Sequence, residues 1–105
     1  MRAYCVSKLA QIVDTMGLAR ELAGKRVTVT ALHPATFMAT KIVPNPISTV
    51  EEGVDATMRL AVSPELEGVT ARYFDGKRET RADAQAYDER AQAKLRELSR
   101  ERTGV

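Results

Sequence analysis

A tyrosine and a lysine near the start of the chain are the residue pair best suited to proton chemistry. Tyr4 and Lys8 stand four positions apart, a spacing that places two side chains on one face of a helix, a turn apart. A phenol has a pKa near ~10, too high for a base at neutral pH, and an ammonium held close favours the phenolate. Such a pair can exchange a proton with an alcohol or a carbonyl oxygen. The same spacing is common on ordinary helices, so the pair alone does not establish catalysis.

The other reactive side chains favour structural roles. His33 is the only histidine, and no cysteine or second histidine stands near it, whereas a metal site needs a cluster of ligands. Cys5 is the only cysteine, so it cannot form an intrachain disulfide, and it has no base partner for nucleophilic catalysis. Glu51 and Glu52 suit the first turn of a helix, where carboxylates are favourable. The sequence therefore predicts no metal site and no catalytic thiol.

The elements that position these residues begin with a helix, which we predict over Ala3–Ala23. Its apolar residues form two neighbouring stripes, which indicates a helix packed on two sides. Gly24 stands where helices end in a left-handed residue. The run Val27–Leu32 is β-branched and almost wholly apolar, which is typical of a strand buried on both faces of a parallel sheet. His33 and Pro34 end that strand.

A long loop and a second pair of elements follow. Residues 35–49 contain prolines and show no clear period, so we expect a loop, which in a compact domain is usually functional or disordered. Ser48 or Thr49 can cap a helix that Pro64 ends. The run Val69–Phe74 predicts a second short strand, closed by an Asp-Gly turn signal.

The C-terminal tail predicts a strongly charged helix from Arg81 to Arg102. One apolar stripe runs along it, formed by Ala84, Tyr87, Ala91, Leu95 and Leu98. Helices thus alternate with apolar strands, which indicates an α/β fold with a parallel sheet. Two strands make a poor sheet, and a strand that is apolar on both faces needs neighbours at both edges. The pattern is therefore that of one part of a larger sheet.

Composition and charge exclude several classes of protein. The chain has 105 residues, 44% of them hydrophobic, and a formal charge of +2 with both signs interspersed, so we expect no nucleic-acid partner. No apolar run approaches the ~20 residues of a membrane span, and the first residues lack the apolar core of a signal peptide. We therefore expect a soluble, cytoplasmic protein without a membrane partner.

An ordered set of segments resembles the short-chain dehydrogenase/reductase family. Tyr4-Cys5-Val6-Ser7-Lys8-Leu9-Ala10 opens the first helix, and the apolar strand then leads to Ala31-Leu32-His33-Pro34-Ala35-Thr36. This order is similar to the family's Tyr-x-x-x-Lys helix, strand and Pro-Gly loop, and Ser-Lys-Leu-Ala and Leu-His-Pro look most like its retinol-dehydrogenase-like branch. The resemblance runs from Ala3 to about Phe74. It implies the C-terminal portion of a Rossmann-type doubly wound parallel sheet, with about two strands and three helices.

The resemblance also implies a site. Tyr4 would be the general acid/base, and Lys8 would lower its pKa and bind the ribose beside the nicotinamide of NAD or NADP. Pro34, Phe37 and Thr40 would lie against the nicotinamide, and the segment from Thr40 to about residue 49 would be the substrate lid. The substrate would be a small alcohol or carbonyl compound. The chain would also be able to associate with itself as a homo-oligomer.

The chain departs from the family pattern in several ways. Ala35 replaces the usual glycine after the loop proline, which would cost strain if that position needs a positive φ. Thr40 stands one residue farther from the proline than is commonest. The Gly-rich turn for the cofactor phosphates, the Asn-Ala-Gly segment and the upstream catalytic serine are all absent from the sequence. Met1 lies only three residues before Tyr4, so we expect an internal methionine taken as a start, or a truncated gene.

Two main hypotheses remain open, besides a chance coincidence of Tyr4 and Lys8 on an unrelated helix. In the first, residues 1–105 are the C-terminal half of a dehydrogenase domain, with residues 81–103 as its charged last helix. That half would belong to an oxidoreductase that transfers hydride between NAD(P) and an alcohol or carbonyl, and alone it would be inactive. In the second, the chain is a non-catalytic remnant that binds itself or another protein.

Overall fold

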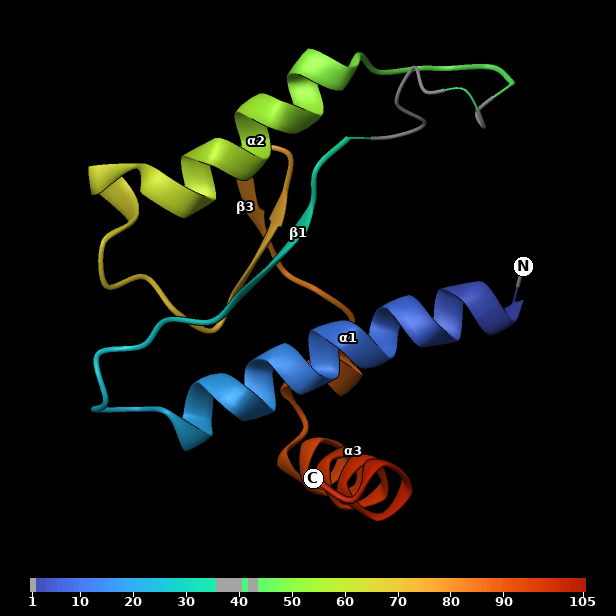
Figure 1. The fold of residues 1–105 in the computed structure, drawn as a ribbon, viewed down its shortest axis with the longest axis vertical. Helices are drawn as coiled ribbons and strands as arrows, with labels where there is room; N and C mark the ends of the chain where they lie inside the picture. Colours follow the sequence, from blue (N-terminus) through green and yellow to red (C-terminus); the bar gives the residue numbers. More distant parts are fainter. Residues whose placement is uncertain (1, 36–40, 42–43) are drawn as a thin grey trace.

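The computed structural model describes residues 2–35, 41 and 44–105. Its described elements stack in the order α2, sheet, α1 and α3, as Figure 1 shows. The sheet holds three described strands in the order β1-β2-β3. The architecture is α/β, as the alternation of helices and strands predicted.

Helix α1 (Arg2–Glu21) matches the predicted first helix to within two residues. The turn after it contains Gly24 with a φ of 82°, a conformation that costs glycine little. The helix contacts β1 on one side and α3 on the other, which accounts for its two apolar stripes. Only Val13, Met16 and Ala19 are fully buried on it, because the N-terminal half of α1 extends beyond the sheet and is exposed.

The sheet is mixed, whereas the sequence predicted only parallel strands. Strands β1 (Thr30–His33) and β2 (Arg72–Asp75) pair in parallel, with Ala31 opposite Tyr73. Strand β3 (Arg78–Thr80) follows a turn at Gly76, whose φ is 62°, and pairs antiparallel with β2. The prediction missed β3 because three residues, two of them charged, carry no strand-like hydrophobic pattern.

Both predicted strands lie later in the chain than their apolar runs. The first was expected over Val27–Leu32 and buried on both faces, but pairing begins only at Thr30 and the strand is half-buried. The second was expected over Val69–Phe74 and pairs only from Arg72. Ala71, with a φ of 57°, interrupts the extended backbone just before this strand. Half-burial of β1 follows from its place at the edge of the described sheet.

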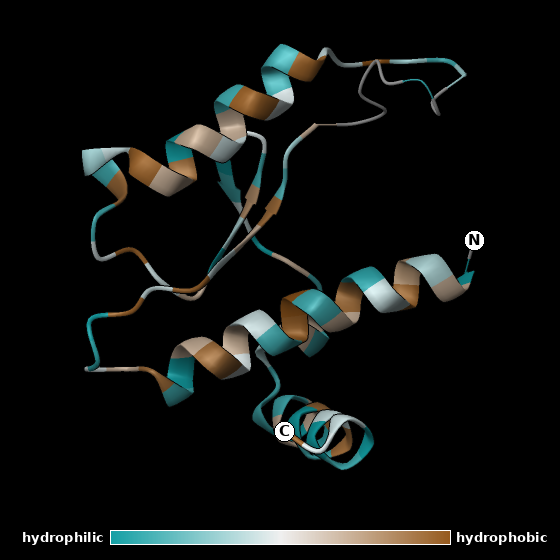
Figure 2. Cartoon of the chain, in the orientation of Figure 1, coloured by the Kyte–Doolittle hydropathy of each residue, from teal (hydrophilic) through white to brown (hydrophobic). Residues whose placement is uncertain are grey.

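Helix α2 (Val50–Val62) confirms the prediction of a capped helix that ends before a proline. The hydroxyl oxygen of Thr49 accepts a hydrogen bond of 3.1 Å from the backbone N–H of Glu52, which satisfies one free donor at the helix start. Pro64 then opens a short 3₁₀ helix, η1 (Pro64–Leu66). In Figure 2, brown and teal residues alternate along α2, so this helix exposes apolar as well as polar side chains.

The tail is two elements, not the single helix predicted over Arg81–Arg102. A 3₁₀ helix, η2 (Ala84–Tyr87), precedes helix α3 (Glu89–Thr103). Asp88 divides them, because its carboxylate accepts a hydrogen bond from the N–H of Arg90 and so starts a new helix. Three residues of the predicted apolar stripe, Tyr87, Ala91 and Leu95, nevertheless pack against the core. Ala86, which the stripe did not include, is fully buried in that core. Among the described residues, no helix combines the length and the hydropathy of a membrane span.

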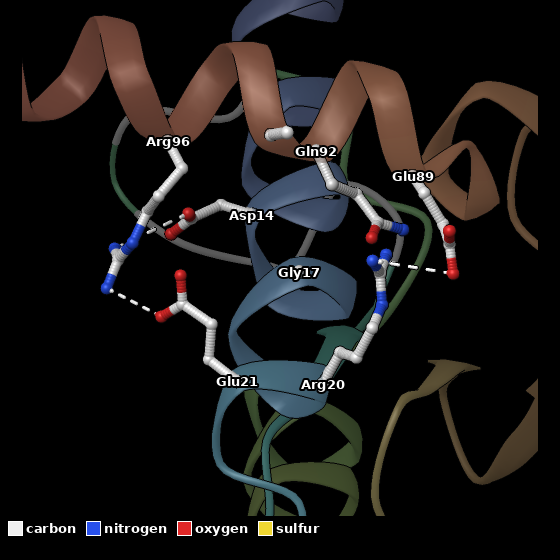
Figure 3. Close-up of a pocket in the computed structure, with 8 residues that line it drawn as sticks. Asp14, Gly17, Arg20, Glu21, Glu89, Gln92 and Arg96 are labelled. Carbon is white, nitrogen blue, oxygen red and sulfur yellow. Dashed lines mark hydrogen bonds and ion pairs between the residues drawn. The ribbon is translucent and has the colours of Figure 1, made fainter.

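Helix α3 docks on α1 through one close contact bordered by ion pairs, drawn in Figure 3. Gly17 lets the helices approach, since a Cβ there would lie 3.2 Å from Cβ of Gln92. The Gln92 amide, itself buried, donates a hydrogen bond of 2.7 Å to the Ala86 carbonyl.

Around this contact lies a pocket of about 340 Å³. Arg96 pairs with Glu21 at 3.2 Å and Arg20 with Glu89 at 3.4 Å. These pairs are solvated, so each stabilises by at most ~1 kcal/mol.

Strand β2 joins the two helical layers through neighbouring side chains. Tyr73 packs against the cluster that α1 and η2 form. Phe74 points to the opposite face, where the guanidinium of Arg59 from α2 lies 5.8 Å from its ring centroid. Phe74 is only 2% exposed, the largest fully buried side chain among the described residues. Its removal should therefore loosen α2 from the sheet.

We expect Phe74→Ala to lower the free energy of unfolding by about 3–5 kcal/mol, the usual cost of emptying a buried aromatic site. Urea denaturation followed by circular dichroism measures it. Val62→Ala, at an end of α2 where the side chain is 67% exposed, is the control and should change stability by less than ~0.5 kcal/mol. Equal effects of the two substitutions would show that Phe74 is not the anchor of this layer.

We expect Tyr73 to make the free energy of unfolding depend on pH in the alkaline range. Burial raises the pKa of its phenol, and the nearby Asp75 carboxylate raises it further. Above pH ~10 the unfolded chain loses this proton first, so the unfolding free energy falls as the pH rises towards the folded-state pKa. Tyr73→Phe should lack this part of the fall. Urea titrations of both proteins between neutral and strongly alkaline pH measure the difference, and curves that stay parallel throughout would contradict the assignment.

Candidate functional site

A groove of about 1000 Å³ opens between the N-terminal half of α1 and the end of β1. Parallel α/β sheets usually bind ligands at this place, outside the carboxyl ends of their strands. The described residues that line it are Tyr4, Cys5, Lys8, Leu9, Gln11, Ile12, Asp14, Thr15, Ala31, Leu32, His33, Pro34, Ala35, Tyr73, Arg81, Ala82 and Asp83. The lining of the groove thus combines apolar side chains with charges of both signs.

Tyr4 and Lys8 lie side by side on the α1 wall of this groove. The Lys8 ammonium lies 5.4 Å from the centroid of the Tyr4 ring, within the range of an attractive cation–π contact. Their helix turn is regular, and the Ser7 hydroxyl donates a hydrogen bond of 2.7 Å to the Tyr4 carbonyl. Tyr4 is 61% exposed, so its hydroxyl is open to a substrate. The catalytic roles of both residues stay predictions.

The loop residues predicted to contact the nicotinamide are described only in part. Pro34 lines the groove directly after β1, and Ala35 follows it. Phe37 and Thr40 lie outside the described residues. Among described non-glycine residues a positive φ occurs at Arg26 and Ala71, so Ala35 does not carry the strain that its replacement of a glycine suggested.

The two other reactive side chains also face the groove. Cys5 is exposed there, and His33 ends β1 beside it. The described part of the chain holds no group of three or more His, Cys, Asp or Glu residues that could bind a metal ion. Proton transfer by Tyr4, supported by Lys8, is a chemistry for which this groove holds suitable side chains.

Several residues that line the groove were not predicted from the sequence, and three of these, Tyr73, Arg81 and Asp83, have polar or charged side chains from segments far from α1 and β1. Tyr73 reaches it from β2, because the parallel register places it opposite Ala31. Arg81 and Asp83 reach it from the segment after β3. The Arg81 guanidinium lies 4.2 Å from the centroid of the Tyr87 ring, which holds it in place. No local pattern marks these positions, because pairing between distant segments brings them to the groove.

The groove fits one end of a dinucleotide better than the other. Lys8 offers donors for a ribose, and Tyr4 and Pro34 offer an open surface beside it. A pyrophosphate is usually bound by a Gly-rich turn at a helix N-terminus, and the sequence contains no Gly-x-Gly-x-x-Gly. The chain therefore carries residues suited to the nicotinamide-ribose end and lacks the usual residues for the phosphates.

Comparisons with known proteins bear on this groove. No family model matches the chain, and no solved structure matches it. Human retinol dehydrogenase 14 is 36% identical over 97% of the chain and 35% of its own length. Human retinol dehydrogenase 13 is 34% identical over 89% of the chain and 34% of its length. Human polyprenol dehydrogenase is 34% identical over 98% of the chain and 36% of its length.

The chain thus spans about a third of the length of the curated relatives it matches. The aligned part nevertheless includes nearly all of its residues, at an identity that chance does not give. These relatives are short-chain dehydrogenases/reductases, and the parallel strands beneath α1 agree with the partial Rossmann-like fold that such a relationship requires. Over nearly all of its residues, the chain is thus similar to one part of these members of the short-chain dehydrogenase/reductase family.

Proposed function

We propose that this chain supplies the proton-transfer half of an oxidoreductase that moves hydride between NAD(P) and an alcohol or carbonyl compound. One observation carries the proposal: Tyr4 and Lys8 meet on the wall of the groove at the carboxyl end of β1. The similarity to these dehydrogenases supports an oxidoreductase of this kind. The substrate class follows from the relatives, which are named for the alcohols retinol and polyprenol.

The chain's own residues would manage the proton and the position of the substrate. During reduction, the Tyr4 hydroxyl would donate its proton to the carbonyl oxygen, and during oxidation the phenolate would take it back. The Lys8 ammonium would stabilise the negative charge left on the Tyr4 oxygen and would donate to a ribose hydroxyl. Leu9 and Ile12, on the same wall, would hold the apolar part of the alcohol. The bound nicotinamide would supply or accept the hydride.

The 105-residue chain alone should show no measurable reductase activity, because it lacks the usual phosphate-binding turn. The measurement follows the absorbance of NADH and of NADPH with all-trans-retinal as substrate. The rate should equal that of a sample without protein. Turnover that is abolished by Tyr4→Phe would contradict this expectation, since it would show a complete site within these residues.

Catalysis by Tyr4 can be tested in a completed domain, in which this chain replaces the aligned third of human retinol dehydrogenase 14. In such a fusion Tyr4→Phe should lower kcat by about 10²- to 10⁴-fold, the usual contribution of a general acid or base. Lys8→Met should also lower kcat, because the charge beside the phenol is lost.

The matched control for both substitutions is Ser7→Ala in the same fusion. Ser7 lies between the two residues on α1, bonds only to the helix backbone and does not line the groove. Its replacement should leave kcat within about twofold of the parent fusion, since a single exposed hydrogen bond contributes little. An active fusion whose turnover survives Tyr4→Phe would refute the catalytic assignment.

A further inference from the structure

A buried amide oxygen at the contact between α1 and α3 has no hydrogen-bond partner. Gln92 is 6% exposed, and its amide nitrogen donates to the Ala86 carbonyl at 2.7 Å. Because a carbonyl can only accept, this bond fixes which end of the amide is the nitrogen. The other end, the oxygen Oε1, is buried and accepts from no donor among the described residues.

The Oε1 atom of Gln92 faces the pocket between the two helices. It lies 3.9 Å from the point where a Cβ would stand at Gly17, and both residues line the pocket. Figure 3 shows the Gln92 side chain extending from α3 towards α1, beside the guanidinium of Arg20. Arg20 pairs with Glu89 at 3.4 Å instead of with this oxygen. The space above Gly17 thus adjoins an acceptor that still needs a donor.

A second polar atom without a partner belongs to Arg96, which lines the same pocket from α3. Its Nε is buried and donates to no acceptor among the described residues, whereas its two Nη atoms pair with Asp14 at 3.9 Å and Glu21 at 3.2 Å. Buried donors and acceptors in native proteins nearly always have a partner. An occupant of the pocket would therefore offer a donor to Gln92 and an acceptor to Arg96.

We infer that this pocket binds a small neutral carboxamide with a short alkyl group. Gln92 and Arg96 stand four residues apart, which is about 6 Å along a helix. An amide carries its donor and its acceptor on different atoms, so it can reach both residues. The ligand N–H would donate to Oε1 of Gln92, and the ligand C=O would accept from Nε of Arg96.

The charges and the size of the pocket favour this class of ligand. All the charged side chains that line it already form ion pairs with one another, so a charged ligand would compete with an existing pair and a neutral one would not. The volume of about 340 Å³ is well above the roughly 30 Å³ of one water molecule. Gly17 and Ala93 add no polar side-chain atoms, which leaves room for an alkyl group.

The pocket is separate from the chemistry proposed for the groove. Its lining contains neither Tyr4 nor Lys8, so amide binding does not depend on proton transfer by these residues. Both of its walls are described helices that pack directly on each other. The site is therefore formed by a contact inside the chain.

The first test titrates the 105-residue chain with propionamide and follows the amide resonances by heteronuclear NMR. The side-chain amide of Gln92 and the backbone amides of Gly17 and Ala93 should shift and saturate, with a Kd in the millimolar range because so small a molecule gains little binding energy. N,N-dimethylpropionamide keeps the carbonyl but has no N–H, so it should bind about tenfold more weakly or worse. The absence of saturable shifts with propionamide would overturn the proposal, and so would equal affinity for the two amides.

A pair of substitutions locates the site. Ala93 is exposed on α3 and lines the pocket, so Ala93→Leu should fill the pocket without unfolding the chain and should weaken propionamide binding about tenfold or more. Ala61→Leu makes the same change at an exposed position of α2 outside the pocket and should bind like the parent. A folded Ala93→Leu chain that binds propionamide as tightly as the parent would overturn the proposal. Should Ala93→Leu unfold, the comparison of the two amides on the parent chain decides.

Discussion

The parallel pairing of β1 with β2 is the constraint on which the other contacts depend. It joins segments about forty residues apart in the chain and sets which side chains of β2 face each layer. Tyr73 meets the α1 side of the sheet and Phe74 the α2 side. A shift of the register by one residue would turn Tyr73 towards α2 and Phe74 towards α1, so each layer would lose the particular ring contact that it makes now.

The groove is a consequence of the same pairing. Strand β1 ends at His33 and Pro34, and α1 crosses beneath it so that Tyr4 and Lys8 lie near this end. The helix is held at its other half, where Val13 and Met16 contact Ala86 of η2. Its first two turns are exposed, which leaves the phenol and the ammonium accessible. One helix therefore supplies both core and site, with the two functions separated along its length.

The similarity to short-chain dehydrogenases/reductases covers the part of the chain that forms the groove. The aligned part of the relatives is about a third of their length, and it is the third in which this chain holds a tyrosine, a lysine and a proline around one groove. Binding of cofactor phosphates needs a Gly-rich turn that the sequence does not contain. The sequence thus contains the two residues of the proposed proton transfer but not the usual phosphate-binding turn.

Elements that local chemistry controls could be predicted from the amino-acid sequence. Periodicity located α1, the Thr49 cap and Pro64 bounded α2, and the spacing of Tyr4 and Lys8 placed them on one helix face. Strand β3 was not predicted because it is short and mostly charged. The break at Asp88 was not predicted because one apolar stripe continues on both sides of it. The start of each strand and the approach of Tyr73 and Arg81 to the groove became known only from the three-dimensional structure. These features depend on backbone pairing between distant segments. The hydrophobic pattern of one segment does not indicate which other segment it pairs with.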